Sequence, residues 1–253
     1  MSDDIILEAR GVTKQFGGLT AVSGVDFTVR RGEILGLIGP NGAGKTTLIN
    51  CLTGVFPIDK RTMTFNGTEL SGLKPHQVTR LGIARTFQIV QPFPNLTVLD
   101  NVVMGALFGS NRAQNNISHA REIAKEKLDF IGLYDKANRV AAELTLVERK
   151  RLELAKSLAT DPELFLLDEV NAGLTIREAE AAMALIHKVR EQGTTVLIIE
   201  HVMKVIMGLS DRVFVLHHGE KIAEGPPREV TSDEHVIRAY LGEKFAARIA
   251  NSA

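Results

Sequence analysis

The sequence has one cysteine, no long apolar run and no excess of one charge. Because Cys51 is the single cysteine, the chain has no disulfide framework of its own, which fits a reducing compartment. Lys plus Arg equals Asp plus Glu at 30 each, which gives no sign of a nucleic-acid binder, since such proteins usually carry a basic excess. No segment approaches the ~18 apolar residues that a membrane span needs. The start, MSDDIILEAR, is acidic and then briefly apolar, so we expect no signal peptide and a soluble chain, although a membrane partner is compatible with these features.

The order of the predicted elements indicates an α/β protein. The 253 residues, of which 44% are hydrophobic, fit one large domain, and we found no internal repeat or low-complexity linker. Strands dominate the first ninety residues, with one helix after a Gly-rich loop, and strands alternate with helices again from residue 163. This pattern predicts a mostly parallel sheet, an N-terminal antiparallel β subdomain and an inserted helical subdomain. The expected parts of this single 1–253 domain are a β/α core at about 1–93 and 159–253, helices at about 94–158, and a C-terminal helix and tail at 231–253.

The strongest motif is the loop GPNGAGKT, which follows an apolar strand and precedes a helix. It matches GxxxxGK[ST], the loop that wraps the phosphates of a nucleotide, and the strand and helix around it make a chance Gly-rich turn a poor alternative. Free N–H groups at the helix start attract an anion, Lys45 is suited to the β and γ phosphates, and Thr46 is suited to Mg²⁺. The expected ATP-binding residues of this loop are Gly39, Asn41, Gly42, Gly44, Lys45, Thr46 and Thr47.

A second acidic motif, ELFLLDE, ends an apolar strand about 120 residues later. Two acids after a strand are by themselves often a surface turn. After a phosphate loop, however, Asp168 is expected to hold the Mg²⁺ shell and Glu169 to polarise the water that attacks the γ phosphate.

With these motifs in order, the sequence resembles the ATP-binding subunit of ABC transporters from about residue 5 to 241. The resemblance implies an adenine-stacking role for Phe16 in TKQFGGLTAV, although from the residues alone Phe16 could also be a core side chain on an edge strand. It implies that Gln88 in GIARTFQ senses Mg²⁺ and the attacking water, where an ordinary loop glutamine is the alternative. It assigns the γ-phosphate contact to His201 in TTVLIIEH. It also implies a loop that crosses to the facing subunit, made of Ala172, Gly173 and Leu174.

The segment that matches the family's signature loop departs from the usual Leu-Ser-Gly-Gly-Gln. Here the loop is Leu144, Thr145, Leu146, Val147 and Glu148, so a hydroxyl is kept while both glycines and the glutamine are lost. Thr145-x-x-Glu148 is also a capping box, and a helix N-terminus still attracts an anion. Two interpretations stay open: a tolerated variant, which we favour, or a degenerate site for the partner's ATP.

The resemblance is nearest to the branched-chain amino acid importers, through FGGLTAV, GIARTFQ, LTVLDNV and YLGE. It implies ATP hydrolysis with ATP and Mg²⁺, driven by closure and reopening of a dimer. The implied partners are a second ATPase chain, membrane permease subunits and, indirectly, a substrate-binding protein, with no nucleic acid. The implied location is the cytoplasmic face of the cell membrane. Lipopolysaccharide-type export and a soluble ABC ATPase without a membrane partner are the alternatives, whereas a small-molecule kinase would leave Gln88 and His201 unexplained.

Overall fold

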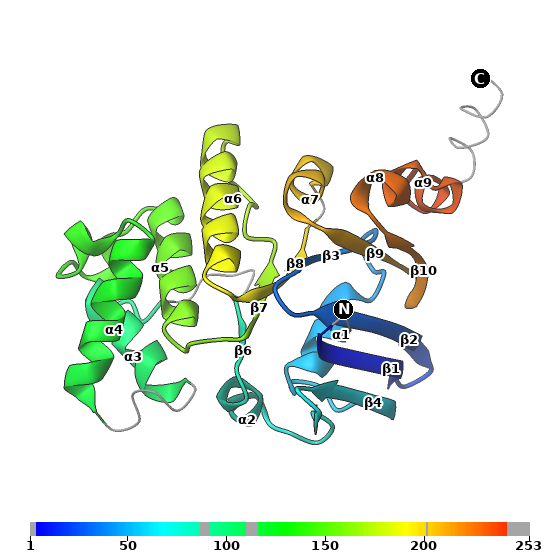
Figure 1. Cartoon of the computed structure of the whole chain (residues 1–253), viewed down its shortest axis with the longest axis horizontal. Helices are drawn as coiled ribbons and strands as arrows, with labels where there is room; N and C mark the ends of the chain where they lie inside the picture. The colour runs from blue at the N-terminus through cyan, green and yellow to red at the C-terminus, as the bar shows by residue number, and fades with distance from the viewer. Residues whose placement is uncertain (1–3, 87–91, 110–115, 201, 242–253) are drawn as a thin grey trace. The chain divides into compact units, whose positions relative to one another are not determined.

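The computed structural model describes residues 4–86, 92–109, 116–200 and 202–241. They fold into two compact units, one formed by the residues up to 74 and from 195 onward, the other by residues 75–194 (Figure 1). The predicted helical subdomain, 94–158, falls inside the second unit together with the strands and helix that flank it. Within the described ranges, no helix has both the length and the hydropathy of a membrane span.

The first unit begins with an antiparallel sheet, as the sequence predicted. Its strand order is β2-β1-β4-β5, and its strands are β1 (Ile5–Phe16), β2 (Leu19–Arg30), β4 (Lys60–Phe65) and β5 (Thr68–Glu69). Alternate residues of β2, Val25, Phe27 and Val29, are buried, which is the period of two expected of a sheet with one covered face. β1 extends to Phe16 because it pairs with β2 along its whole length.

A second sheet of this unit carries the phosphate loop. It contains β3 (Ile34–Ile38), β8 (Thr195–Ile199), β9 (Arg212–His217) and β10 (Glu220–Gly225). β3 pairs in parallel with both β8 and β9, and β9 and β10 form the antiparallel hairpin that was predicted. Every residue of β3 and β8 is buried, as expected of parallel strands covered on both faces. The carboxyl end of β3 leads through the loop into helix α1 (Lys45–Leu52).

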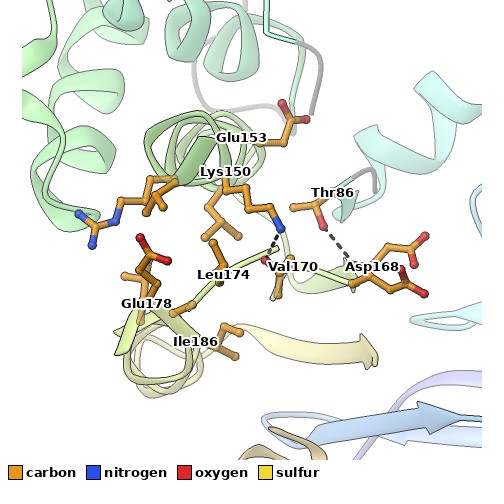
Figure 2. A pocket seen from close by; sticks show the side chains of 14 residues that line it. Thr86, Lys150, Glu153, Asp168, Val170, Leu174, Glu178 and Ile186 are labelled. Carbon is orange, nitrogen blue, oxygen red and sulfur yellow. Dashed lines mark hydrogen bonds between the residues drawn. The ribbon is translucent and has the colours of Figure 1, made fainter. Parts of the chain in front are cut away.

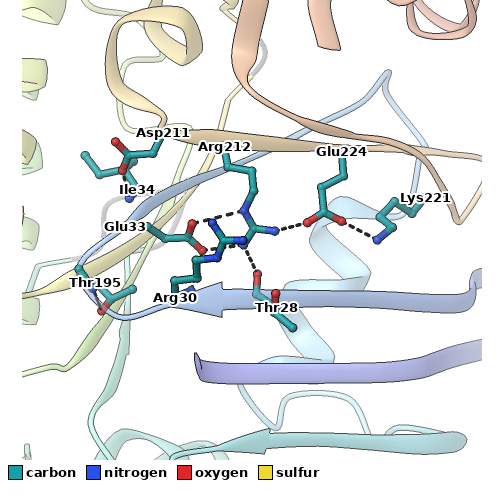
Figure 3. A network of polar contacts seen from close by, with 10 residues as sticks. Thr28, Arg30, Glu33, Ile34, Thr195, Asp211, Arg212, Lys221 and Glu224 are labelled. Atoms are coloured by element: carbon teal, nitrogen blue, oxygen red, sulfur yellow. Dashed lines mark hydrogen bonds and ion pairs between the residues drawn. The ribbon is translucent and has the colours of Figure 1, made fainter. Parts of the chain in front are cut away.

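A buried ion-pair network holds the amino end of β3 to its neighbours (Figure 3). Arg212 Nη2 donates to Glu33 Oε1 at 2.7 Å and to the carbonyl oxygen of Thr28 at 2.6 Å, and its guanidinium also pairs with Glu224. Burial lowers the pKa of Arg212, but its bonds and charge interactions with Glu33 and Glu224 outweigh this effect, so the pKa is raised. Asp211 accepts from the amide of Ile34 at 2.8 Å, which ties the start of β9 to the start of β3.

The second unit joins a short parallel strand pair to a group of helices. β6 (Ile83–Arg85) pairs in parallel with β7 (Leu164–Asp168), and α6 (Ile176–Glu191) follows. Helices α3 (Val98–Phe108), α4 (Ile117–Phe130) and α5 (Leu146–Leu158) pack on one another and are drawn in green (Figure 1). At Gly105, α3 approaches α5 so closely that a Cβ atom would overlap the carbonyl oxygen of Lys156.

Two short helices were not predicted. The first ninety residues contain α2 (Pro75–Arg80) besides α1, so the expectation of a single helix there was wrong. The region after β10 contains α8 (Pro227–Ser232) before α9 (Glu234–Leu241), and α7 (Met203–Leu209) lies between β8 and β9 in the sequence. α2 and α8 both begin at a proline, a residue that favours the first position of a helix. Each is six residues long and buries one residue, so neither shows the helical repeat of apolar residues from which a helix is predicted.

Candidate functional site

The phosphate loop of the first unit has the backbone that close approach to an anion requires. Gly39, Gly42 and Gly44 have φ values of 154°, 80° and 102°, which side chains rarely tolerate. A Cβ atom at Gly39 would also collide with the carbonyl oxygen of Leu216, and one at Gly44 with that of Ala21. The backbone conformation therefore requires glycine at all three positions, and packing requires it at Gly39 and Gly44 as well.

Lys45 lies at the start of α1 and folds back over the loop. Its Nζ donates to the carbonyl oxygens of Gly39 at 2.6 Å and Pro40 at 3.0 Å, and the residue is 9% exposed. α1 has no side-chain cap, so its first N–H groups are not satisfied by a capping side chain. Thr46 and Asn41 are exposed, as groups that meet a ligand should be. This end of α1 is built to receive a phosphate group.

Phe16 ends β1 as an exposed aromatic ring. It is 42% exposed and packs edge-on against Phe56, with ring centroids 5.2 Å apart. Beneath it, Lys14 is 5.3 Å from the ring centroid and pairs with Asp59 at 2.8 Å, a hydrogen bond that lowers the pKa of Asp59. The ring is not a core side chain of the unit, so the alternative interpretation of Phe16 is wrong, and its exposed face can take a flat ligand.

In the second unit, Asp168 lies at the carboxyl end of β7 in a buried polar setting. Its Oδ2 accepts from Arg85 Nη2 at 2.8 Å, and its amide donates to Thr86 Oγ1 at 3.2 Å. Both charged side chains are less than a tenth exposed. Among the residues that the structure describes, no donor reaches Oδ1, so this oxygen can accept from a metal-bound water. A carboxylate is a hard oxygen donor of the kind that Mg²⁺ prefers.

Glu169 follows with a left-handed backbone, φ 48°, which is uncommon for a residue other than glycine. Beyond it, the loop that contains the predicted crossing residues Ala172, Gly173 and Leu174 runs to α6. Thr175 caps that helix in a capping box with Glu178, whose Oε2 accepts from the Thr175 amide at 2.7 Å. The loop is thus fixed at both ends, by β7 and by the cap.

The signature-loop segment forms the N-terminus of α5, with the predicted capping box present. Thr145 Oγ1 accepts from the Glu148 amide at 3.4 Å, and Glu148 Oε2 accepts from the Thr145 amide at 3.0 Å. Glu148 also pairs with Lys136, and these two contacts, Lys136 first, lower its pKa. Leu144 is buried, whereas Leu146 is 53% exposed and lies 3.6 Å from where a Cβ of Gly173 would be; Val147 is partly exposed.

A pocket lies between α5, α6 and the loop after β7 (Figure 2). Its walls include the apolar side chains of Leu154, Leu174 and Ile186, and the ammonium of Lys150 extends from α5 toward the loop.

Lys150, Arg85 and Lys136 were not singled out from the sequence. Most basic side chains in a sequence are solvated, and only the tertiary partners of these three distinguish them from ordinary surface charges. Gln88 and His201, both predicted site residues, lie outside the described residues.

Two models of protein families match this chain. The ABC transporter model matches residues 22–172, and a model described as branched-chain amino acid ATP-binding cassette transporter matches residues 220–246. The chain belongs to the ABC transporter family of ATPases. The family and fold predicted from the motifs are therefore confirmed, and so is the enzyme class.

Relatives of this ABC ATPase match it over almost the whole length. It is 42% identical to the high-affinity branched-chain amino acid transport ATP-binding protein LivG of Salmonella typhimurium and 39% identical to BraF of Pseudomonas aeruginosa. Each alignment covers 94% of this chain and 98% of the relative. A crystal structure of a nucleotide-free ATP-binding cassette from an ABC transporter has a TM-score of 0.85 and 31% identity, covering 94% of this chain and all of that one. A dimeric cassette bound to ADP and phosphate has a TM-score of 0.77 and 26% identity, over 88% of this chain and 99% of that one.

As an ABC ATPase, the chain binds nucleotide, and the phosphate loop is the part built for it. The roles of single residues stay predictions, as do the limits of the helical subdomain.

Proposed function

We propose that this chain is the ATP-hydrolysing subunit that energises import of branched-chain or other amino acids. The transport roles of LivG and BraF support the substrate class, and so does the family model matched at the C-terminus. Lipopolysaccharide-type export and a soluble role have no comparable support. The observation that carries the proposal is the phosphate loop, with its glycine backbone and the folded-back Lys45.

The proposed ATP site assigns one task to each group. Phe16 stacks on adenine, and the loop amides and Lys45 neutralise the phosphates. Thr46 and Asp168 hold Mg²⁺, which when bound neutralises phosphate charge and orients the phosphates. Glu169 orients the attacking water. Gln88 and His201 are proposed to sense Mg²⁺ and the γ phosphate.

The proposed partner across the interface is a second ATPase chain, the same or homologous, arranged head to tail. The signature loop of each subunit then acts on the ATP of the other. Here the Thr145 hydroxyl accepts from the Glu148 amide, which leaves its proton available to a phosphate oxygen. Because Lys136 pairs with Glu148, the carboxylate charge that replaces glutamine is neutralised locally. Both features favour a working variant over a degenerate site.

The remaining partners are membrane permease subunits, which place the chain at the cytoplasmic face of the membrane, and an indirect substrate-binding protein. The helical block, about 94–158, is the proposed docking face. Crosslinking from Phe93, which is 46% exposed, tests this contact. If crosslinks from Phe93 never reach a membrane subunit, docking occurs elsewhere.

The decisive experiment for ATP-driven closure uses Glu169→Gln, which should bind ATP without hydrolysing it. We expect this variant to sediment as a dimer with Mg-ATP and as a monomer without it, and Lys45→Ala to remain monomeric in both. A Glu169→Gln monomer that binds ATP tightly would show that the signature loop cannot complete a site on its own copy. Uptake of labelled leucine by cells lacking this chain tests the substrate class, with restoration by wild type and not by Lys45→Ala.

A further inference from the structure

Lys150 links the signature helix to the loop that carries Glu169. It lies on α5, two residues beyond the signature loop, and its Nζ donates to the carbonyl oxygens of Val170, at 2.9 Å, and of Ala172 (Figure 2). A lysine ammonium has three donors and no acceptor, so two carbonyls of one short loop suit it well. The contact ties two segments that are twenty residues apart in the sequence.

The loop needs such a restraint. Glu169, at φ 48°, has a backbone conformation that is unfavourable for a residue other than glycine and persists only where the surroundings hold it. Turn bonds within the loop join Ala172 N to Glu169 O at 3.1 Å and Leu174 N to Asn171 O at 3.2 Å. Lys150 adds a charged contact that joins the middle of this loop to α5.

The surroundings of Lys150 strengthen its bonds to the loop. Two carboxylates that line the same pocket have partners elsewhere: Glu178 is bonded to Thr175 in the capping box, and Glu153 pairs with Lys156 at 2.7 Å. The apolar walls at Leu154 and Leu174 keep water away from part of the stem. Hydrogen bonds from a charged donor are stronger in such a setting than in water.

We propose that Lys150 is a positioning residue that couples the two ATP sites of the dimer. This inference rests on the proposed head-to-tail dimer, in which α5 presents its signature loop to the partner's ATP while Glu169 acts on its own subunit's ATP. When the signature loop engages the partner's nucleotide, α5 carries Lys150 with it, and the loop brings Glu169 to its working position. One site is then set for hydrolysis by the occupation of the other.

The test compares Lys150→Met, Lys150→Gln and Lys150→Arg with Lys125→Met, a control on the neighbouring helix α4 whose exposed ammonium pairs with the exposed Glu122. The measurements are kcat, the Hill coefficient for ATP, and the nucleotide Kd. We expect Lys150→Met to lower kcat roughly 10- to 100-fold, the range produced by small misplacement of a reacting group, and to reduce the Hill coefficient to one. The nucleotide Kd should stay within twofold of wild type. Lys150→Arg should recover most of kcat, Lys150→Gln should lie between, and Lys125→Met should match wild type.

The outcomes separate this inference from the proposed function. If wild type hydrolyses ATP and Glu169→Gln dimerises, but Lys150→Met keeps kcat and cooperativity, the coupling role is wrong and the proposed function stands. If Lys150→Met weakens nucleotide binding in proportion to kcat, or Lys150→Arg restores nothing, the coupling role is also wrong. Wild type without ATPase activity overturns both proposals. Should Lys150→Met fail to fold, Lys150→Gln, which is one atom shorter than lysine but keeps a polar donor group, gives the same test.

Discussion

Removal of the Arg212 guanidinium should destabilise the first unit strongly. The substitution Arg212→Met keeps an unbranched apolar stem and leaves Glu33, whose side chain is 8% exposed, without its charged partner. At the 2.7 Å separation of Arg212 and Glu33, the attraction at an effective dielectric constant near 20 is about 6 kcal/mol, most of it offset by the burial of both charges. Breaking a buried pair costs about 3–5 kcal/mol. The 13% exposure of Arg212 points to the low end, about 3 kcal/mol.

The assay is thermal unfolding followed by circular dichroism. For a chain of this size, 1 kcal/mol shifts Tm by about 2–4 °C, so Arg212→Met should lower Tm by roughly 6–12 °C. Lys221→Met is the matched control, because its pair with Glu224 is more exposed and worth about 1 kcal/mol or less.

A double variant isolates the cause of the loss. Adding Glu33→Gln to Arg212→Met removes the unpaired charge and keeps an oxygen for the Arg30 amide, which donates to Glu33 at 2.6 Å. We expect it to recover about half of the lost Tm. The reasoning is refuted if Arg212→Met costs no more than Lys221→Met, or if the double variant is less stable than Arg212→Met alone.

Three further predictions concern the phosphate loop, the cysteine and the signature helix. Gly44→Ala, at φ 102° and with a backbone oxygen in its way, should weaken nucleotide binding at least roughly tenfold, measured with a fluorescent nucleotide, while Gly18→Ala, which has open space and no positive φ, should not. Burial raises the pKa of Cys51 to about 11, so about one thiol in a thousand is ionised at pH 8. Its reaction with a thiol reagent should be roughly 100-fold slower than that of an exposed thiol, about a quarter ionised there, and should speed up in urea; a rate within tenfold of an exposed thiol would contradict this. Lys136→Met should lower the urea midpoint of unfolding, and the full loss should be present at pH 7, above the ordinary glutamate pKa of about 4.3. The loss should vanish as the pH falls through the lowered pKa of folded Glu148. An equal loss at pH 3 would contradict this prediction.

Motifs that depend on backbone geometry were the most predictable from the sequence. The phosphate loop and the Thr145–Glu148 capping box both formed, because local residue types decide them. The same holds for the buried strands β3 and β8, whose continuous apolar runs leave few alternatives.

Contacts between distant residues were not predictable. Arg85 lies 83 residues from Asp168, and Lys150 reaches carbonyl oxygens, which carry no sequence signal at all. Arg212 and Glu33 are 179 residues apart, and each would pass as a surface charge in its own segment. α2 and α8 were missed because packing and a leading proline, not an apolar period, determine them.

The close approach of α3 to α5 at Gly105 makes these helices a lever. A side chain between two helices can change rotamer and absorb part of a movement, but here backbone meets backbone, and packed backbone compresses little. A rotation of α5 would therefore pass to α3 undiminished. Over the eleven residues of α3, about 16 Å of helix, a rotation of roughly ten degrees displaces the far end by about 3 Å. A small turn at the signature loop thus becomes a displacement large enough to shift a docked protein surface.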